Sequence, residues 1–233
     1  MTVYQEVART LESEIRSGLS NGDFLPSEAA LAGRVSINRH TVRRAIDELV
    51  NAGLVLRQHG KGTMVVNNRI EYSIGARGRF TETLEEQGLH PSCQVISVQT
   101  MRVDSKLAAR MRVAPDADVT RIDTLRCVDD QPICVISHYL LDALLPGIGE
   151  GFKSGSLHAF IESHYGLRIQ RRQCLVGASL PTASEARLLH CPRQLPLVVV
   201  KSNNTLWGEN AIVEYSVSRS RSDVFEMKIE SAR

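Results

Sequence analysis

The sequence predicts a protein of the α+β class, with a small helical domain followed by a larger domain on a largely antiparallel sheet. Up to about residue 66 the apolar residues recur at helical spacing, and beyond it they alternate as in half-buried strands. A chain of 233 residues with 42% hydrophobic and 23% charged residues is long enough for two globular domains. We expect the first domain at 1–66, a linker at 67–74 and the second domain at 75–233.

Three helices are expected in the first domain. The first spans residues 3–17, and the second spans 28–34 after Ser27, a good N-cap. The third runs from its N-cap Asn38 to Ala52, where a glycine follows. Its apolar stripe should be buried against the other two helices and consists of Val42, Ala45, Ile46 and Leu49.

The opposite face of the third helix is basic near its start. A charged helix face is most often just solvated surface, so this face alone does not establish DNA binding. Its position in a helix-turn-helix favours base reading, because the start of a recognition helix is the part that meets base edges. The candidate contacts on this helix are Arg39, His40, Thr41, Arg43 and Arg44.

A β-hairpin is expected directly after the third helix. Residues 54–57 and 63–66 are short apolar segments, and the tip between them contains two glycines. Helix, turn, helix and hairpin together make a winged helix-turn-helix. Residues 34–66 hold six Lys and Arg against two acids, whereas residues 71–233 hold 19 of each sign, so the positive excess lies where DNA would bind. The candidate contacts on the wing are His59, Gly60 and Lys61.

The run LPSEAALAGRVSINRHTVRRAIDELVNAGLVLRQHGKGTMVV resembles the DNA-binding domain of GntR-type transcription regulators. The resemblance covers residues 4–66. It implies that the recognition helix contacts DNA through Arg39, Thr41 and Arg43, and the wing through its tip. Some relatives have an arginine directly after the LPSE glutamate, where this chain has Ala29, so one contact is missing there.

The second domain should interleave strands with short helices, which indicates an α+β fold on a largely antiparallel sheet. The expected helices are 79–87, 105–111, 157–165 and 182–189. The expected strands are 91–101, 119–128, 133–140, 168–180, 195–206, 211–220 and 225–230.

This second part resembles the UTRA effector domain of the HutC branch of GntR regulators, whose fold is similar to chorismate lyase. The resemblance spans residues 75–231. It is carried by RF at 79–80, LEEQG at 84–88, LR at 125–126, SLH at 156–158 and VEYS at 213–216. Within the branch, INRHTVRRAID, GSLHAF and EYSVSRSRSD look most like the PhnF-type regulators of phosphonate-utilisation genes. The resemblance implies a repressor that is released by a small anionic metabolite such as a phosphonate or phosphate ester.

Arg126, on an expected strand, suits an oxyanion because a guanidinium can bind one bidentately. Ser156 begins a helix and can hold a phosphate with the backbone N–H groups there, although it can equally be a plain N-cap. Sugar-phosphate-sensing relatives tend to have arginine and glutamate where this chain has Thr124 and Ile136, which disfavours an amino-sugar phosphate. The full set of expected effector-binding residues is Arg79, Phe80, Thr81, Arg126, Ser156, His158, Glu214 and Arg221.

Other functions have less support in the sequence. The five cysteines and seven histidines have no metal-ligand spacing, so we expect neither a metal nor a cofactor. No nucleophile is paired with a base, so we expect no catalytic residue and no enzyme activity, despite the lyase-like fold. The chain has no signal peptide and no membrane segment, which predicts a cytoplasmic protein. We expect a homodimer on an inverted-repeat operator. An activator, or a regulator of another catabolic pathway, remains the alternative.

Overall fold

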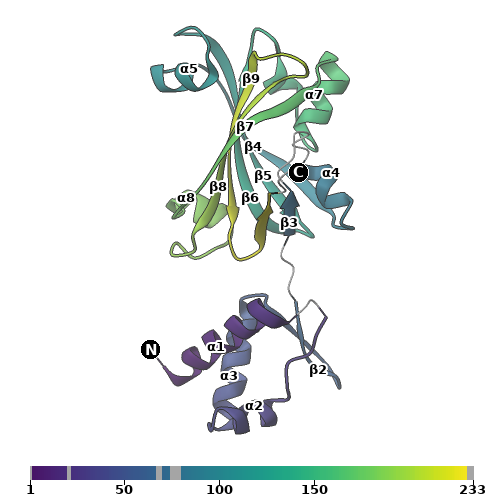
Figure 1. The fold of residues 1–233 in the computed structure, drawn as a ribbon, viewed down its shortest axis with the longest axis vertical. Coiled ribbons are helices and arrows are strands. Elements are labelled where there is room, and N and C mark those ends of the chain that lie inside the picture. Colours follow the sequence, from purple (N-terminus) through teal and green to yellow (C-terminus); the bar gives the residue numbers. More distant parts are fainter. Residues whose placement is uncertain (1, 20–21, 67–69, 74–79, 230–233) are drawn as a thin grey trace. The chain divides into compact units, whose positions relative to one another are not determined.

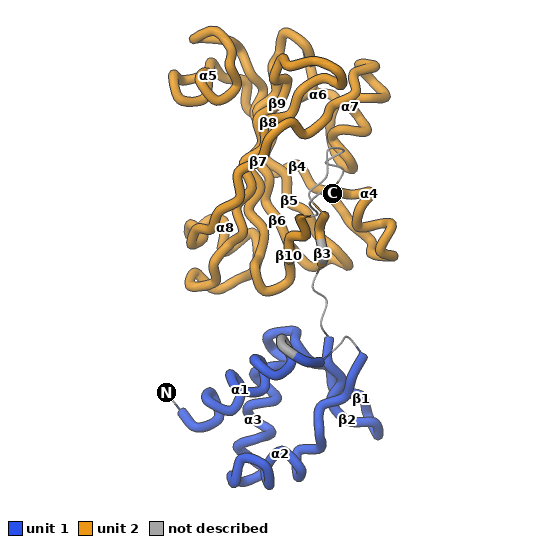
Figure 2. The backbone as a smooth tube through the Cα atoms, viewed as in Figure 1, with its two compact units in different colours: residues 1–69 blue, residues 70–233 orange. Residues whose placement is uncertain are grey.

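The chain folds into two compact units, residues 1–69 and residues 70–233 (Figure 2). The structure is a computed structural model, and it describes residues 2–19, 22–66, 70–73 and 80–229. Within the described ranges no helix is both long enough and apolar enough to cross a membrane.

In its described residues the first unit contains three helices and a two-stranded antiparallel sheet (Figure 1). They follow one another as α1 (Val3–Gly18), α2 (Glu28–Arg34), α3 (Arg39–Asn51), β1 (Val55–Gln58) and β2 (Gly62–Val65). This is the predicted winged helix-turn-helix, with the hairpin β1–β2 as its wing.

Local sequence signals fix the helix ends in this unit. The Ser27 side chain accepts a hydrogen bond from the backbone N–H of Ala30, and that of Asn38 accepts one from Thr41 at 2.8 Å. The whole predicted stripe of α3 is at most 2% exposed and packs against the buried face of α1. The core of this unit therefore fixes which face of α3 remains in solvent.

The second unit is built on a six-stranded sheet in which every neighbouring pair is antiparallel. In spatial order the strands are β4 (Pro91–Arg102), β5 (Asp118–Val128), β6 (Gln131–Leu141), β9 (Ile212–Arg221), β8 (Leu197–Leu206) and β7 (Ile169–Ser179). The predicted α+β class with a largely antiparallel sheet is confirmed.

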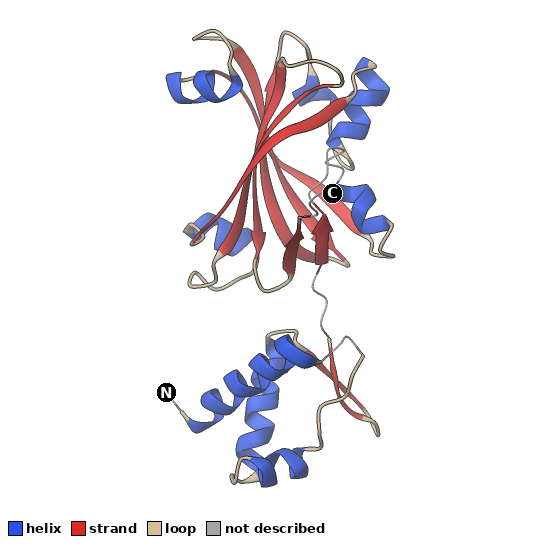
Figure 3. Ribbon diagram, in the orientation of Figure 1, coloured by secondary structure: helices blue, strands red, loops and turns tan. Residues whose placement is uncertain are grey.

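Short helices accompany this sheet in the part of the unit that the structure describes (Figure 3). Ile148 and Phe152 at one helix and Leu157 at the next pack with Ile122 and Leu140 of the sheet in one apolar cluster. Met111 packs in a different cluster, with Val199 and Val217 of the sheet. The helices are α4 (Phe80–Glu85), α5 (Ser105–Met111), α6 (Ile148–Gly151), α7 (Leu157–Tyr165) and α8 (Ala183–Leu188). The sequence did not predict α6.

A second, two-stranded sheet includes residues 70–73 of the predicted linker at 67–74. Ile70–Ser73 forms β3, which pairs in parallel with β10 (Phe225–Lys228) and belongs to the second unit. Ile70 and Tyr72 are each 4% exposed, and the Tyr72 ring stacks on Phe225 at 5.7 Å between centroids. This segment was mistaken for linker because its partner strand lies at the other end of the chain.

Candidate DNA-binding surface and effector pocket

The first turn of α3 presents two exposed side chains to solvent, those of Arg39 and His40. Thr41 is half-buried, and its hydroxyl lies 3.0 Å from Oδ1 of the capping residue Asn38. Asn38 therefore stabilises the helix start through both the backbone and the side chain of Thr41. This start is the part of a recognition helix that reaches into the major groove.

Arg43, one turn further along α3, is held by a carboxylate from α2. Its Nε lies 3.1 Å and its Nη2 2.8 Å from Oε2 of Glu28. Hydrogen bonds from Arg43 outweigh the effect of burial and hold the pKa of Glu28 below its ordinary value. Arg43 itself remains 59% exposed, so the ion pair orients the guanidinium without burying it.

Arg57 on β1 extends this pair into a charged cluster. Its Nη1 lies 2.6 Å from Oδ1 of Asp47, and its Nη2 lies 3.7 Å from Oε1 of Glu28. Neither Arg57 nor Glu28 was predicted as a site residue. Their ion pairs join residues that are far apart in the sequence, so they depend on the tertiary fold.

Arg44 faces a different direction from Arg43. Its guanidinium carbon lies 4.2 Å from the ring centroid of Tyr4 on α1, a cation–π contact. The predicted wing residues His59, Gly60 and Lys61 are all exposed in the turn between β1 and β2. Gly60 has a φ of 76°, a conformation that side-chain-bearing residues rarely adopt, so the tight tip depends on glycine there.

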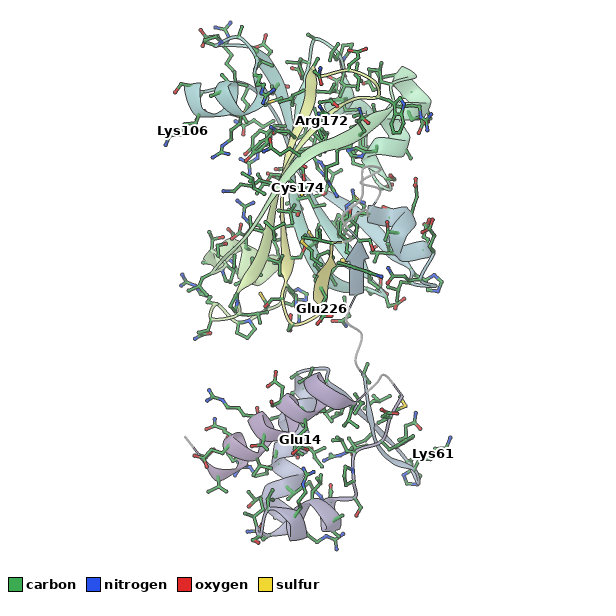
Figure 4. All side chains as sticks on the ribbon, in the orientation of Figure 1. Glu14, Lys61, Lys106, Arg172, Cys174 and Glu226 are labelled. Carbon is green, nitrogen blue, oxygen red and sulfur yellow. The ribbon has the colours of Figure 1, made fainter. Side chains whose placement is uncertain are left out.

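The second unit contains a pocket that opens between the six-stranded sheet, the start of α7 and the β3–β10 pair. Its volume is about 60 Å³, which is room for a few water-sized groups. Figure 4 shows how densely side chains fill this unit. Five of the predicted effector residues line the pocket: Phe80, Arg126, Ser156, His158 and Glu214.

Arg126 is 4% exposed and reaches from β5 across the pocket. Its Nη1 donates to the hydroxyl of Thr81 at 3.2 Å and to the carbonyl oxygen of Gly155 at 3.1 Å. Its Nε is buried without a partner, and no carboxylate of the described residues forms an ion pair with it. A buried guanidinium without a counter-charge is costly unless an anion compensates it.

Arg171 on β7 supplies a second guanidinium to the same pocket. Its Nη2 donates to the hydroxyl of Tyr72 at 3.3 Å, whereas its Nε and Nη1 are buried and have no partner in the described part of the chain. Arg171 was not predicted as a site residue. Its neighbour Arg172 does not line the pocket, and a β-bulge between Arg171 and Gln173 interrupts the strand alternation that would otherwise show which side chain turns inward.

A hydrogen-bonded network surrounds Glu214, which is fully buried on β9. Its Oε1 lies 2.6 Å from Nδ1 of His138, and its Oε2 lies 2.7 Å from both Nε2 of His158 and Nδ2 of Asn204. Because an ionised carboxylate only accepts hydrogen bonds, all three partners must donate to it. His138 and Asn204 were not predicted, although a single histidine inside an otherwise apolar strand was a usable signal.

These contacts determine the charge state of the network. Burial by itself would raise the pKa of Glu214, but the two histidines hold it well below its ordinary value. Burial lowers the pKa of His138 below its ordinary value, although Glu214 opposes this effect. At neutral pH Glu214 is therefore ionised and His138 is neutral. The pocket thus contains one carboxylate and two permanently charged guanidinium groups.

The remaining predicted residues are placed as follows. Thr81 contacts Arg126, as described, and Ser156 is the N-cap of α7, accepting from the N–H of Ala159 at 3.3 Å. Arg79 lies outside the described residues. Arg221 was wrongly grouped with the pocket: it does not line it, because its guanidinium binds Asp223 through Nε and Nη2. Within the described ranges, no cluster of three His, Cys, Asp or Glu is arranged to hold a metal ion.

Comparison with known proteins agrees with both units. Residues 3–65 match the family described as bacterial regulatory proteins, gntR family, and residues 86–226 match the UTRA domain. The chain is 37% identical over 229 residues to the probable transcriptional regulator PhnF of Escherichia coli (strain K12), covering 98% of this chain and 95% of that protein. It is 28% identical over 222 residues to the HTH-type transcriptional repressor NagR of Bacillus subtilis (strain 168), and the match covers 95% of this chain and 91% of that protein.

Among solved structures, PhnF from Mycobacterium smegmatis matches 99% of both chains with a TM-score of 0.70 and 27% identity. This chain thus shares the overall fold of that structure and has a gntR part followed by a UTRA part. The chain belongs to the gntR family of bacterial regulatory proteins, as a DNA-binding transcription regulator of the HutC branch with a UTRA domain.

Proposed function

We propose that this regulator represses genes for the use of phosphonates or other organophosphorus compounds and leaves its operator when a small anion binds the effector pocket. The observation that carries the proposal is the buried guanidinium of Arg126, which has no carboxylate partner among the residues described. The similarity of this chain to PhnF proteins supports the proposal that the target genes and the ligand concern phosphorus compounds.

The pocket is suited to a tetrahedral oxyanion. Arg126 and Arg171 both present unpaired N–H groups to it, and the first turn of α7 begins beside it at Ser156. Charge-assisted hydrogen bonds from guanidinium to phosphate oxygens are among the stronger polar contacts in proteins. One anion would compensate charges that the protein leaves unbalanced.

The DNA-binding surface consists of the start of α3 and the tip of the wing. Arg39, Arg43 and His59 are exposed there, and the charged cluster around Glu28 orients Arg43. One winged module covers only a half-site, so the regulator should bind an inverted repeat as a homodimer. It should act in the cytoplasm, where the operator DNA is. Light scattering that gives a monomer, both free and on DNA, would contradict the dimer.

The decisive experiment compares wild type with Arg126→Ala in operator titrations, with and without phosphonates, phosphate esters and carboxylate metabolites. Both proteins should bind the operator equally well without a ligand. A phosphonate or phosphate ester should lower wild-type operator affinity, and a 100-fold drop corresponds to a coupling of about 2.7 kcal/mol. The variant should not respond. Release of wild type by carboxylates alone would indicate a regulator of another catabolic pathway, and an unchanged response in Arg126→Ala would refute the pocket assignment.

A further inference from the structure

Asn204 on β8 has a buried amide oxygen that has no hydrogen-bond partner among the residues the structure describes. The side chain is 2% exposed and lines the effector pocket. Its Nδ2 lies 2.7 Å from Oε2 of Glu214 and 3.5 Å from the hydroxyl oxygen of Ser216. Since the Glu214 carboxylate only accepts, Nδ2 must face it, and this fixes the orientation of the amide. Oδ1 is then left without a hydrogen-bond donor.

Glu214 makes the surroundings of this oxygen electronegative. Its two oxygens already receive hydrogen bonds from His138, His158 and Asn204, so a ligand has little room to bind them directly. The carboxylate charge nevertheless lies one amide group away from Asn204 Oδ1. A donor at Oδ1 would therefore be favoured further if it carried a positive charge.

Unpaired donors lie next to this unpaired acceptor. Arg171 and Asn204 are opposite each other in the antiparallel pairing of β7 with β8. Cross-strand neighbours on one face have Cβ atoms roughly 5 Å apart, and both side chains line the pocket. Arg171 contributes the buried Nε and Nη1, which have no partner among the described residues. Acceptor and donors are therefore within the span of one small molecule.

We propose that the pocket recognises an anion that carries a hydrogen-bond donor a few bonds away, an ammonium group in preference to a hydroxyl. The oxyanion binds the guanidinium groups, and the donor binds Asn204 Oδ1. This inference rests on the proposed function, because it assumes that the effector binds in this pocket. It adds that the effector is zwitterionic rather than a simple anion.

Three phosphate monoesters that differ only in their terminal group test the inference: ethyl phosphate, 2-hydroxyethyl phosphate and 2-aminoethyl phosphate. In calorimetric titrations of the full chain, 2-aminoethyl phosphate should bind at least about tenfold more tightly than ethyl phosphate, as expected for a hydrogen bond to a charged group. The hydroxyl compound should be intermediate. Asn204→Leu, which keeps the side-chain size and removes the acceptor, should bind all three about equally. The control Asn203→Leu, at the preceding residue of β8, which does not line the pocket, should keep the wild-type ranking.

The outcomes separate this inference from the proposed function. Wild type that binds all three compounds with equal affinity retains the anion site and overturns the role of Asn204. Wild type that binds none of them overturns the anion site itself. If Asn204→Leu does not fold, the wild-type ranking still decides, because a ratio of one between 2-aminoethyl and ethyl phosphate excludes a donor-reading pocket.

Discussion

Glu28 on α2 holds Arg43 on α3 by one edge of the guanidinium, through Nε and Nη2. Nη1 has no partner among the described residues, so the other edge remains available. An arginine presented in this way can donate two parallel hydrogen bonds to O6 and N7 of a guanine. The ion pair therefore restricts the side chain before DNA arrives, which reduces the entropy lost on binding.

A double-mutant cycle tests this orienting role of Glu28. Glu28→Ala should weaken binding to the specific operator by several-fold while leaving binding to unrelated DNA unchanged or stronger, because a negative charge is removed near the phosphates. In the background Arg43→Ala, the same change should have little effect on specific binding. Additive effects of the two substitutions, measured at one salt concentration, would show that the pair does not act as a unit.

Arg39→Ala, Arg43→Ala and His59→Ala should each weaken operator binding without unfolding the protein. A bidentate contact from arginine to guanine contributes about 1 to 3 kcal/mol, which a titration at fixed salt readily detects. Arg102→Ala serves as the control and should bind the operator normally. Arg102 is an exposed arginine of the second unit, where it is paired with Asp118. Unchanged affinity in both α3 variants would reject α3 as the recognition helix.

Arg171 and its neighbour Arg172 form a matched pair for the second cation of the pocket. Arg171 lines the pocket and Arg172 is exposed to solvent. Arg171→Met should lower the affinity for ethyl phosphate by about tenfold or more, as for loss of a charge-assisted hydrogen bond. Arg172→Met should leave it unchanged. Calorimetry would contradict the assignment if the two variants behaved alike.

The second unit should lose stability as the pH falls below neutral. The pKa of His138 is lowered by burial and that of Glu214 is lowered by its histidine partners, so in both cases the unfolded chain takes up the proton first. Stability therefore decreases as the pH falls below the ordinary histidine pKa of about 6.5, and decreases further below that of glutamate.

Trp207, the single tryptophan, lies in the second unit, so its fluorescence reports the unfolding of that unit. The midpoint of thermal unfolding should fall between pH 7.5 and pH 5.5, by an amount that His138→Gln reduces. His90→Gln, which removes an exposed histidine, should keep the wild-type pH dependence. An identical pH profile in His138→Gln and wild type would rule out His138 as the titrating group.

Most of the fold could be predicted because its elements are encoded locally. The stripe of α3, its cap Asn38 and the glycines of the wing are all visible in short windows of sequence. The same holds for the Thr182 capping box before α8. In contrast, β3 depends on a partner more than 150 residues away, and four residues carry too little periodicity to reveal a strand.

The pocket was predicted only in part, for a related reason. Arg126 and Ser156 stand in recognisable family strings, and both line it. Arg171 and Asn204 are ordinary polar residues of long strands, and their roles arise from a bulge and a cross-strand pairing. Arg221 was expected in the pocket as a second, weaker cation, but Asp223, two residues later, already pairs with it.

The parallel pairing of β3 with β10 also bears on the order in which the protein folds during synthesis. The winged helix-turn-helix draws its core from residues 7–65 alone and can fold soon after it leaves the ribosome. In the described part of the chain, β3 pairs only with β10, and Tyr72, Phe225 and Met227 all line the pocket. The proposed effector pocket is therefore completed only when β10 has been translated, so a nascent chain acquires its winged helix-turn-helix fold before this pocket is formed.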